Sequence, residues 1–483
     1  MEKLVILANQ ELVHMMQKRL FLIPLLILVF FGCATMPEGS TPETVPEEGA
    51  DEETLLEEEE TDRYQAVSSY FLAGDVEQAI EEIEQAMEED PESAETNVLY
   101  SSLLMTAGEL DEARDTLEEV IAENPENRDA LFNMALLSAM RGDDEAQEDY
   151  LEEILSLNPD DSLAHASLGE LHLQNRDLES AEESFQASIE ADPENMVARV
   201  GLGNVYIRQE NYEAAEEQFT EAIEQEPDYP FSYVDRSRVR ASQGEVGQAI
   251  DDITRAIELE PDFYWNYIDR GKLYLYRRNN RLALQDFNRA IEIDPEYFYA
   301  YVYRAGILND MGRYEDAEGD FLHVLSQRPD YHFAYGPVGI IRFIHEDWEN
   351  AREMLGLAFE HEDYELSYPL LIALTFMKQD QQNQARQYLT NNLHLFPRDS
   401  LQYQVARFLM SPGFDGNIVR LINDEQDHET KYKMLYYLGE AYLVRGNTTL
   451  ANTYFNEVAE NLGPGMMERR LARVELERMS GDE

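Results

Sequence analysis

The 483-residue chain has a single cysteine, Cys33. No intramolecular disulfide can form, so any folded part must depend on a buried apolar core. Apolar residues make up 43% of the chain, which is sufficient for such a core and excludes wholesale disorder.

Positive charge is also scarce. Lysine and arginine number 37 against 99 acidic residues, giving a formal net charge of −62. This excess repels polyanions, so we expect no nucleic-acid partner. The acidic residues would attract basic partners or divalent cations, or would simply solvate a large exterior.

The common catalytic and cofactor motifs are missing. The sequence contains no P-loop, no nucleophile elbow, no HExxH and no CxxC. The GLGN stretch at 201–204 lacks the third glycine of a dinucleotide-binding loop. We therefore expect no enzymatic activity, no cofactor and no metal site.

Only one long stretch is strongly apolar, and it lies near the N-terminus. Lys18 and Arg19 precede the apolar run 20–31, whose 12 residues are too few to span a bilayer comfortably as a helix. This pattern predicts a signal peptide at 1–32. Residues 1–14 suggest an over-extended reading frame, with the true start at Met15 or Met16.

Gly32 and Cys33 resemble the lipobox of bacterial lipoproteins, although Phe30 replaces the usual leucine. The resemblance implies that Cys33 becomes the first mature residue and carries acyl chains such as palmitate. A plain signal peptide, cleaved or uncleaved, is the alternative. Ala34 after the cysteine tends to permit sorting to the outer membrane in diderm bacteria. We expect a lipid-anchored envelope protein, periplasmic or surface-exposed, with the outer membrane favoured over the inner.

Residues 33–62 are rich in Pro, Glu and Thr and contain no lysine or arginine. Such a segment cannot bury enough apolar surface to fold alone, and its like charges repel one another. We predict an acidic disordered tether that holds the folded part away from a membrane.

From residue 63 onward, proline recurs every 34 residues. The series is Pro91, Pro125, Pro159, Pro193, Pro227, Pro261, Pro295 and Pro329, with Pro397 two periods later. Alanine occurs twelve residues before nearly every position of this 34-residue series, from Ala79 to Ala385, and Gln147 is the exception. The pattern resembles the tetratricopeptide repeat, a helix–turn–helix unit of 34 residues. The resemblance implies an all-α, right-handed α-solenoid of about eleven repeats.

The spacing of small and large residues has a physical reason. With each proline at position 32 of its window, position 8 is mostly glycine, serine or alanine, and position 20 is almost always alanine. Small residues at both places let the two helices of a repeat approach closely. Position 24 is always a large apolar residue, and the proline ends the second helix. One helix pair cannot bury its apolar face alone, so neighbouring pairs must stack.

These windows divide the rest of the chain. We predict ten repeats at 63–399, an irregular helical segment at 400–431, an eleventh repeat at 432–465, and a C-terminal capping helix with a tail at 466–483.

Three successive windows carry arginine at position 7 and aspartate at position 23, and no other window has either residue there. The predicted pairs are Arg236 with Asp252, Arg270 with Asp286, and Arg304 with Asp320. The tetratricopeptide resemblance places these two positions opposite each other across a helix pair. We therefore expect three structural ion pairs.

The resemblance also implies that positions 2, 9 and 13 line a concave groove that contacts bound peptides. An aromatic band beside a short basic column falls on these positions. The predicted partner-binding residues are Asn204, Arg208, Phe231, Arg238, Trp265, Lys272, Tyr276, Tyr299 and Phe333. A peptide with a carboxylate and an apolar anchor would suit them. Alternatively, the aromatic residues pack one repeat on the next and the basic residues are ordinary surface charges.

The sequence thus indicates a membrane-anchored envelope scaffold that binds a protein or peptide partner. Two alternatives are a ligand-capturing accessory of an envelope transport system and an assembly factor for a secretion or pilus machine. The oligomeric state is not predicted.

Overall fold

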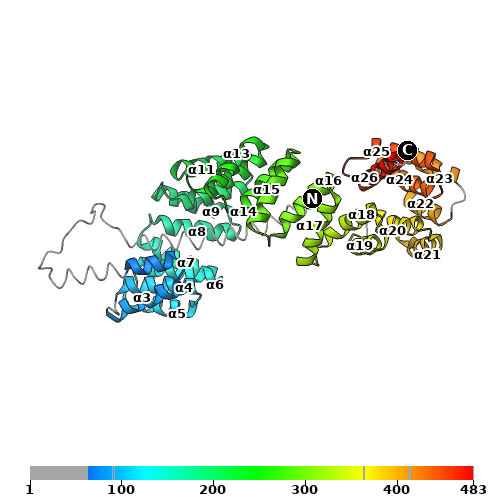
Figure 1. Ribbon diagram of the computed structural model, residues 1–483. Helices are drawn as coiled ribbons and strands as arrows, with labels where there is room; N and C mark the ends of the chain where they lie inside the picture. Colours follow the sequence, from blue (N-terminus) through cyan, green and yellow to red (C-terminus); the bar gives the residue numbers. More distant parts are fainter. Residues whose placement is uncertain (1–63, 90, 92, 363–364, 412–414, 482–483) are drawn as a thin grey trace, which may run out of the picture. The chain divides into compact units, whose positions relative to one another are not determined.

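The computed structural model describes residues 64–89, 91, 93–362, 365–411 and 415–481, in which every regular element is a helix (Figure 1). The predicted signal peptide, the lipidation site Cys33 and the acidic tether lie outside these residues. The described residues divide into two compact units, one up to Pro261 and one from Asp262, which are described separately below.

In the first unit, a helical stretch at 64–72 precedes α3 (Val76–Glu89). The remaining helices of this unit are α4 (Ala94–Ala107), α5 (Leu110–Glu123), α6 (Arg128–Arg141), α7 (Asp144–Leu157), α8 (Ser162–Gln174), α9 (Leu178–Ala191), α10 (Met196–Arg208), α11 (Tyr212–Gln225), α12 (Pro230–Ser242) and α13 (Val246–Leu259).

The second unit continues the same alternation. Its helices are α14 (Tyr264–Tyr276), α15 (Asn280–Ile293), α16 (Phe298–Asp310), α17 (Tyr314–Gln327), η1 (His332–Ala334), α18 (Tyr335–Ile344), α19 (Trp348–His361), α20 (Ser367–Lys378), α21 (Gln382–Asn392), η2 (Leu393–Leu395), α22 (Leu401–Met410), α23 (Asp415–Asp424), α24 (His428–Val444), α25 (Thr448–Asn461) and α26 (Met467–Gly481).

Each 34-residue window from 94 to 399 holds one helix pair, and within each unit successive pairs pack on one another. The predicted all-α solenoid of stacked helix pairs is therefore confirmed. The tight turn inside a pair places position 15 in the left-handed backbone region. Glycine takes this conformation readily at Gly312, whereas Arg278 adopts it at φ 57°.

Close approach within a pair explains the small residues at position 8. A Cβ added to Gly271 would lie 2.9 Å from the ring of Phe287, which occupies position 24 and is fully buried. Gly203 has the same relation to Phe219, at 2.7 Å. The repeated glycine–phenylalanine contact thus sets the spacing between the two helices.

Residues 400–431 contain two short helices, α22 and α23, which pack on each other, and α22 also contacts α21 and α24. After the α24–α25 pair, α26 packs against α25 and α24. It buries Leu471 and Ala472 in the large apolar cluster of the second unit.

Candidate functional site

The structure brings each predicted arginine–aspartate pair together. Each arginine donates two parallel hydrogen bonds to one carboxylate: Nε and Nη2 lie 3.1 and 2.8 Å from Asp252 in the first pair, 2.9 and 2.7 Å from Asp286 in the second, and 2.8 and 2.7 Å from Asp320 in the third. This fork-to-fork geometry is specific to arginine.

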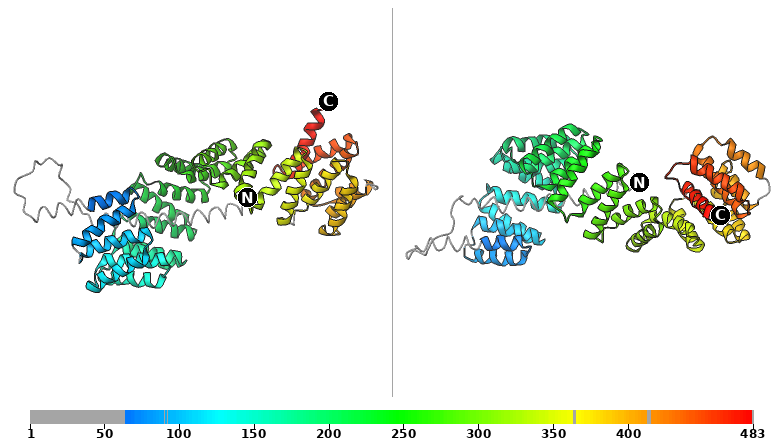
Figure 2. Two further views of the ribbon diagram at one scale, coloured as in Figure 1. Left: turned by 60° about the horizontal axis from the view of Figure 1, so that its bottom comes forward. Right: turned by 45° about the horizontal axis from the view of Figure 1, so that its top comes forward.

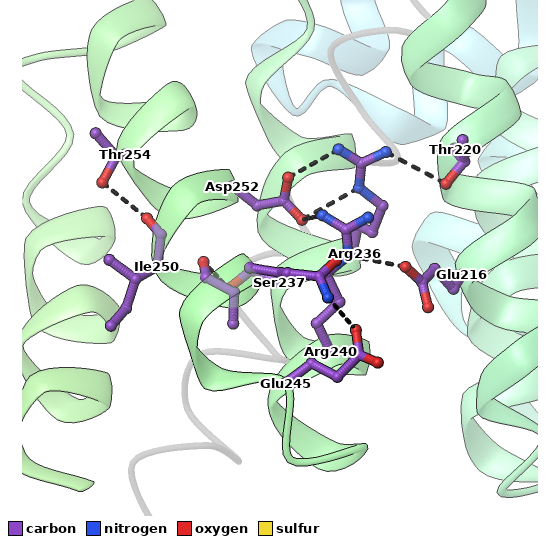
Figure 3. A network of polar contacts seen from close by, with 11 residues as sticks. Glu216, Thr220, Arg236, Ser237, Arg240, Glu245, Ile250, Asp252 and Thr254 are labelled. Atoms are coloured by element: carbon purple, nitrogen blue, oxygen red, sulfur yellow. Dashed lines mark hydrogen bonds and ion pairs between the residues drawn. The ribbon is translucent and has the colours of Figure 1, made fainter. Parts of the chain in front are cut away.

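The first pair belongs to a larger polar network in the first unit (Figure 3). Arg236 Nη1 also donates to the Thr220 hydroxyl on the preceding helix, at 3.2 Å. Arg240 donates to Asp252 and to Glu216, each at 2.8 Å. The two arginines therefore join α11, α12 and α13. In the second unit Arg304 on α16 bonds Asp320 on α17, and its Nη1 also donates to Asn288 Oδ1 on α15, at 2.8 Å.

Burial makes these carboxylates dependent on their partners. Burial raises the pKa of Asp286 above its usual value, although the Arg270 guanidinium acts in the opposite direction. Arg270 also lies 5.8 Å from the ring centroid of Tyr267, a favourable cation–π arrangement. The pairs are structural elements of the helix interface.

The aromatic band lies largely inside the second unit. Trp265 and Tyr299 are only 5% and 9% exposed. Tyr297 lies between them, with ring centroids 4.6 Å from Trp265 and 5.8 Å from Tyr299. These contacts favour the alternative given above, in which the rings of Trp265 and Tyr299 pack one repeat on the next, and the partner-binding role of the two residues stays a prediction.

The basic column is locally neutralised. Arg238 Nη1 lies 2.9 Å from Asp235, and Lys272 Nζ lies 2.9 Å from Asp269. Each base is three residues after its aspartate on the same helix. An acidic partner would have to compete with these aspartates, which weakens the case for carboxylate capture at Arg238 and Lys272.

Other predicted groove residues are accessible. Phe333 is 36% exposed and Tyr276 is 76% exposed, while Arg208 is exposed at the end of α10. Asn204 and Phe231 are half-buried, and the Phe231 ring lies 5.4 Å from that of Tyr229.

Tyr276 begins an exposed basic stretch whose arginines were not among the predicted partner-binding residues. Arg277, Arg278 and Arg281 are all exposed around the turn between α14 and α15. Within the part of the chain that the structure describes, none of these three side chains makes an ion pair or hydrogen bond. Their charge is therefore available to an acidic group.

A second overlooked residue is Glu170 on α8. Burial raises the pKa of this carboxyl to about 7, while a hydrogen bond from Gln174 and the charge of Arg208 act in the opposite direction. Glu170 occupies position 9 of its window, one of the positions predicted to line the groove. It was not among the predicted groove residues because the prediction at position 9 was based on basic side chains.

A third overlooked feature is a buried ionic cluster in the second unit. Lys378 Nζ on α20 lies 2.8 Å from Glu440 on α24 and 3.0 Å from Glu475 on α26. Tyr436 Oη donates to Glu440 at 2.8 Å. Burial alone would lower the pKa of Lys378, but the two glutamates raise it. The lysine is therefore charged in the folded protein.

Among the described residues, no cluster of three or more His, Cys, Asp and Glu side chains could hold a metal ion. In the same part of the chain, no helix is long and apolar enough to cross a membrane.

Family models described as tetratricopeptide repeat match residues 70–140, then 144–195, 166–230, 200–263 and 268–332, and finally 433–461. No curated protein matches the chain significantly.

Several solved structures are similar. A tetratricopeptide repeat protein from Parabacteroides merdae is 21% identical, with 51% of this chain and 98% of that chain covered and a TM-score of 0.39. The pilF protein of Pseudomonas aeruginosa is 19% identical, covering 42% and 92%, with a TM-score of 0.38. YrrB, described as a TPR protein with an unusual peptide-binding site, is 22% identical, covering 38% and 95%, with a TM-score of 0.33.

The family matches cover more than half of the chain and follow the helix pairs seen in the structure. This chain therefore belongs to the tetratricopeptide repeat family.

Proposed function

We propose that this protein is a membrane-anchored scaffold of a bacterial envelope that binds an acidic protein or peptide segment. A tetratricopeptide solenoid is consistent with a protein-interaction scaffold, and such folds are typically non-enzymatic. The lipobox-like Gly32–Cys33 and the acidic stretch after it support the anchor and the tether.

The observation that carries the binding proposal is the exposed stretch Tyr276, Arg277, Arg278 and Arg281, named here the YRR patch. The chain carries a net charge of −62, and most of the arginines described above are engaged by aspartates or glutamates. Three arginines around a 76%-exposed tyrosine offer both charge and an apolar anchor. An acidic segment with one aromatic or aliphatic side chain fits this combination.

The aromatic band favours a scaffold over a ligand-capturing accessory. Its rings pack directly on one another, with Tyr264 and Tyr297 centroids 5.0 Å apart, so they fill the space between helices. An open surface suits a polypeptide segment better than an enclosed small ligand.

The test is capture of partners from detergent-solubilised envelopes, followed by mass spectrometry. The intact protein is compared with an Arg277→Glu/Arg281→Glu variant, which reverses charge at exposed positions. An Arg398→Glu/Arg420→Glu variant makes the same charge change elsewhere on the exposed surface of this unit. We expect a partner that is retained by the intact protein and the control but lost from the patch variant. Identical partner sets for all three proteins would contradict the proposal.

The anchor has its own test. Cells expressing the intact protein or a Cys33→Ser variant are fed a clickable palmitate analogue. We expect label and membrane association only for the intact protein. Absence of label from the intact protein would exclude the lipid anchor.

A further inference from the structure

The last helix, α26, reaches back to the first helices of three earlier pairs. Arg470 Nη2 lies 3.3 Å from Asp310 at the end of α16. Arg478 donates to the carbonyl of Ile344 at the end of α18, and Glu475 contacts Lys378 at the end of α20. In Figure 2 this helix is red and belongs to the second unit.

These three contacts share one repeat position. Asp310, Ile344 and Lys378 are each at position 13 of successive windows, the position that Tyr276 occupies in the window before them. The hydroxyl of Ser367, at position 2, also donates to Glu468 of α26, at 2.5 Å. Positions 2 and 13 belong to the surface predicted to receive a peptide, so α26 occupies position 13 in these three windows and position 2 in the last of them.

The chemistry of α26 defines what this surface accepts. Glu468 and Glu475 are seven residues apart, so they lie on one face of the helix, about two turns from each other. Glu468 accepts from Ser367 and from Tyr437, and Glu475 meets Lys378. Leu471, between them in the sequence, is buried against the apolar cluster.

The docking is also poised to reverse. Glu468 is buried, and among the described residues its Oε2 has no hydrogen-bond partner, so holding this carboxylate ionised in the interface is costly. In agreement, burial raises the pKa of Glu468, although the Ser367 hydrogen bond and Lys433 act in the opposite direction. When α26 leaves, Lys378 keeps Glu440 as a partner, so no buried charge is left alone on α20 and α24.

We propose that α18, α20, α24 and α25 form a helix-binding surface that α26 occupies as an internal ligand, which a partner displaces. The partner that fits is an amphipathic helix with an acidic side chain opposite Lys378, an apolar residue four positions before it, and a hydrogen-bond acceptor seven positions before it for Ser367 and Tyr437. This proposal rests on the proposed function, because it identifies the class of segment that the scaffold binds.

The first test is hydrogen exchange of the full-length protein and two variants. Glu475→Lys places a cation against Lys378, whereas Glu477→Lys makes the same charge change at an exposed position on the same helix. We expect Glu475→Lys to remove amide protection from α26 alone, with α20 and α24 still protected, and Glu477→Lys to leave protection unchanged. Simultaneous loss across α20, α24 and α26 would overturn the proposal, because α26 would then be an inseparable part of the core.

The second test uses a fluorescent peptide of residues 466–481 added to each full-length protein. The peptide supplies Glu468 and Glu475 in trans. We expect roughly ten- to hundredfold tighter binding to the Glu475→Lys variant than to the wild type or the Glu477→Lys control. The reason is that the apparent Kd equals the intrinsic Kd divided by the fraction of molecules whose site is vacant. Equal affinity for all three proteins, or no binding to the opened variant, would overturn the proposal.

Failure of this proposal can be told apart from failure of the proposed function. If a captured partner binds wild type and Glu475→Lys equally, the internal-ligand proposal is wrong while partner binding stands. If α26 is released and replaced by its own peptide but no envelope partner is found, the displaceable helix stands and the scaffold function is wrong.

Discussion

The Arg270–Asp286 pair gives the sharpest test of the helix interface. The aspartate side chain is 6% exposed and the arginine side chain 18% exposed, so truncating either one strands a buried charge. Arg270→Met keeps the alkyl stem and removes only the guanidinium. The stranded Asp286 should then cost on the order of 3–5 kcal/mol of local stability.

The Asp286→Leu variant strands Arg270 in the same way. The double variant leaves no buried charge, because an apolar pair fills the same space. We expect the double variant to be less destabilised than the sum of the two single variants, with a coupling of about 2–3 kcal/mol.

The assay is native-state hydrogen exchange of amides in α14 and α15. A repeat array need not unfold in one step, so a local measurement is more reliable than a single melting curve. The arginine–aspartate interpretation is falsified if the two single-variant losses simply add.

The remaining predictions use single substitutions. Gly271→Ala should destabilise the α14–α15 pair by about 1–3 kcal/mol in local hydrogen exchange, because its Cβ would lie 2.9 Å from a buried ring. Gly306→Ala is the matched control and should stabilise by about 0.5–1 kcal/mol, since nothing lies within 4 Å of its Cβ; destabilisation by both would refute the close-approach argument. The raised pKa of Glu170, about 7 against an ordinary 4.5, means that its contribution to stability is complete below pH 4.5 and is lost as pH rises through 7. Hydrogen exchange of α8 amides between pH 5 and 8, corrected for the intrinsic exchange rate, should show this loss in the wild type and not in Glu170→Gln; parallel pH profiles would contradict it. Glu468→Gln should slow amide exchange of α26, because it removes a buried charge that faces Ser367, Tyr437, Lys433 and Glu365. The exchange rate of the wild type, corrected for the intrinsic rate, should fall towards that of the variant as pH falls, because burial raises the pKa of Glu468 and the carboxyl becomes protonated. Faster exchange in the variant would show that the ionised carboxylate holds the helix in place.

The fold could be predicted from the sequence because the recurring residues are those that contact one another within each helix pair. A glycine at position 8 and a phenylalanine at position 24 recur because they touch, as Gly271 and Phe287 do. The arginine–aspartate series was readable for the same reason. Each of these contacts lies within one helix pair, so a fixed spacing along the chain reports it.

Features that depend on a long-range contact or on local burial were harder to predict. An aromatic residue at position 2 can face a partner or a neighbouring repeat. Residue type alone does not distinguish Trp265, which is buried, from Phe333, which is half-exposed. The return of α26 to Lys378 joins residues 97 apart in the sequence, at no multiple of the repeat. The raised pKa of Glu170 depends on desolvation, which composition does not report.

The arginine forks also determine how the array opens. Arg236 ties α12 to the helices on both of its sides, and Arg304 does the same for α16. Thermal fluctuations should therefore release α11–α13 as one cooperative block and α15–α17 as another, to which the Arg270–Asp286 fork adds α14, although the sequence repeats in helix pairs. The smallest cooperative unit is thus larger than one 34-residue repeat, because single arginine side chains bond helices of neighbouring repeats.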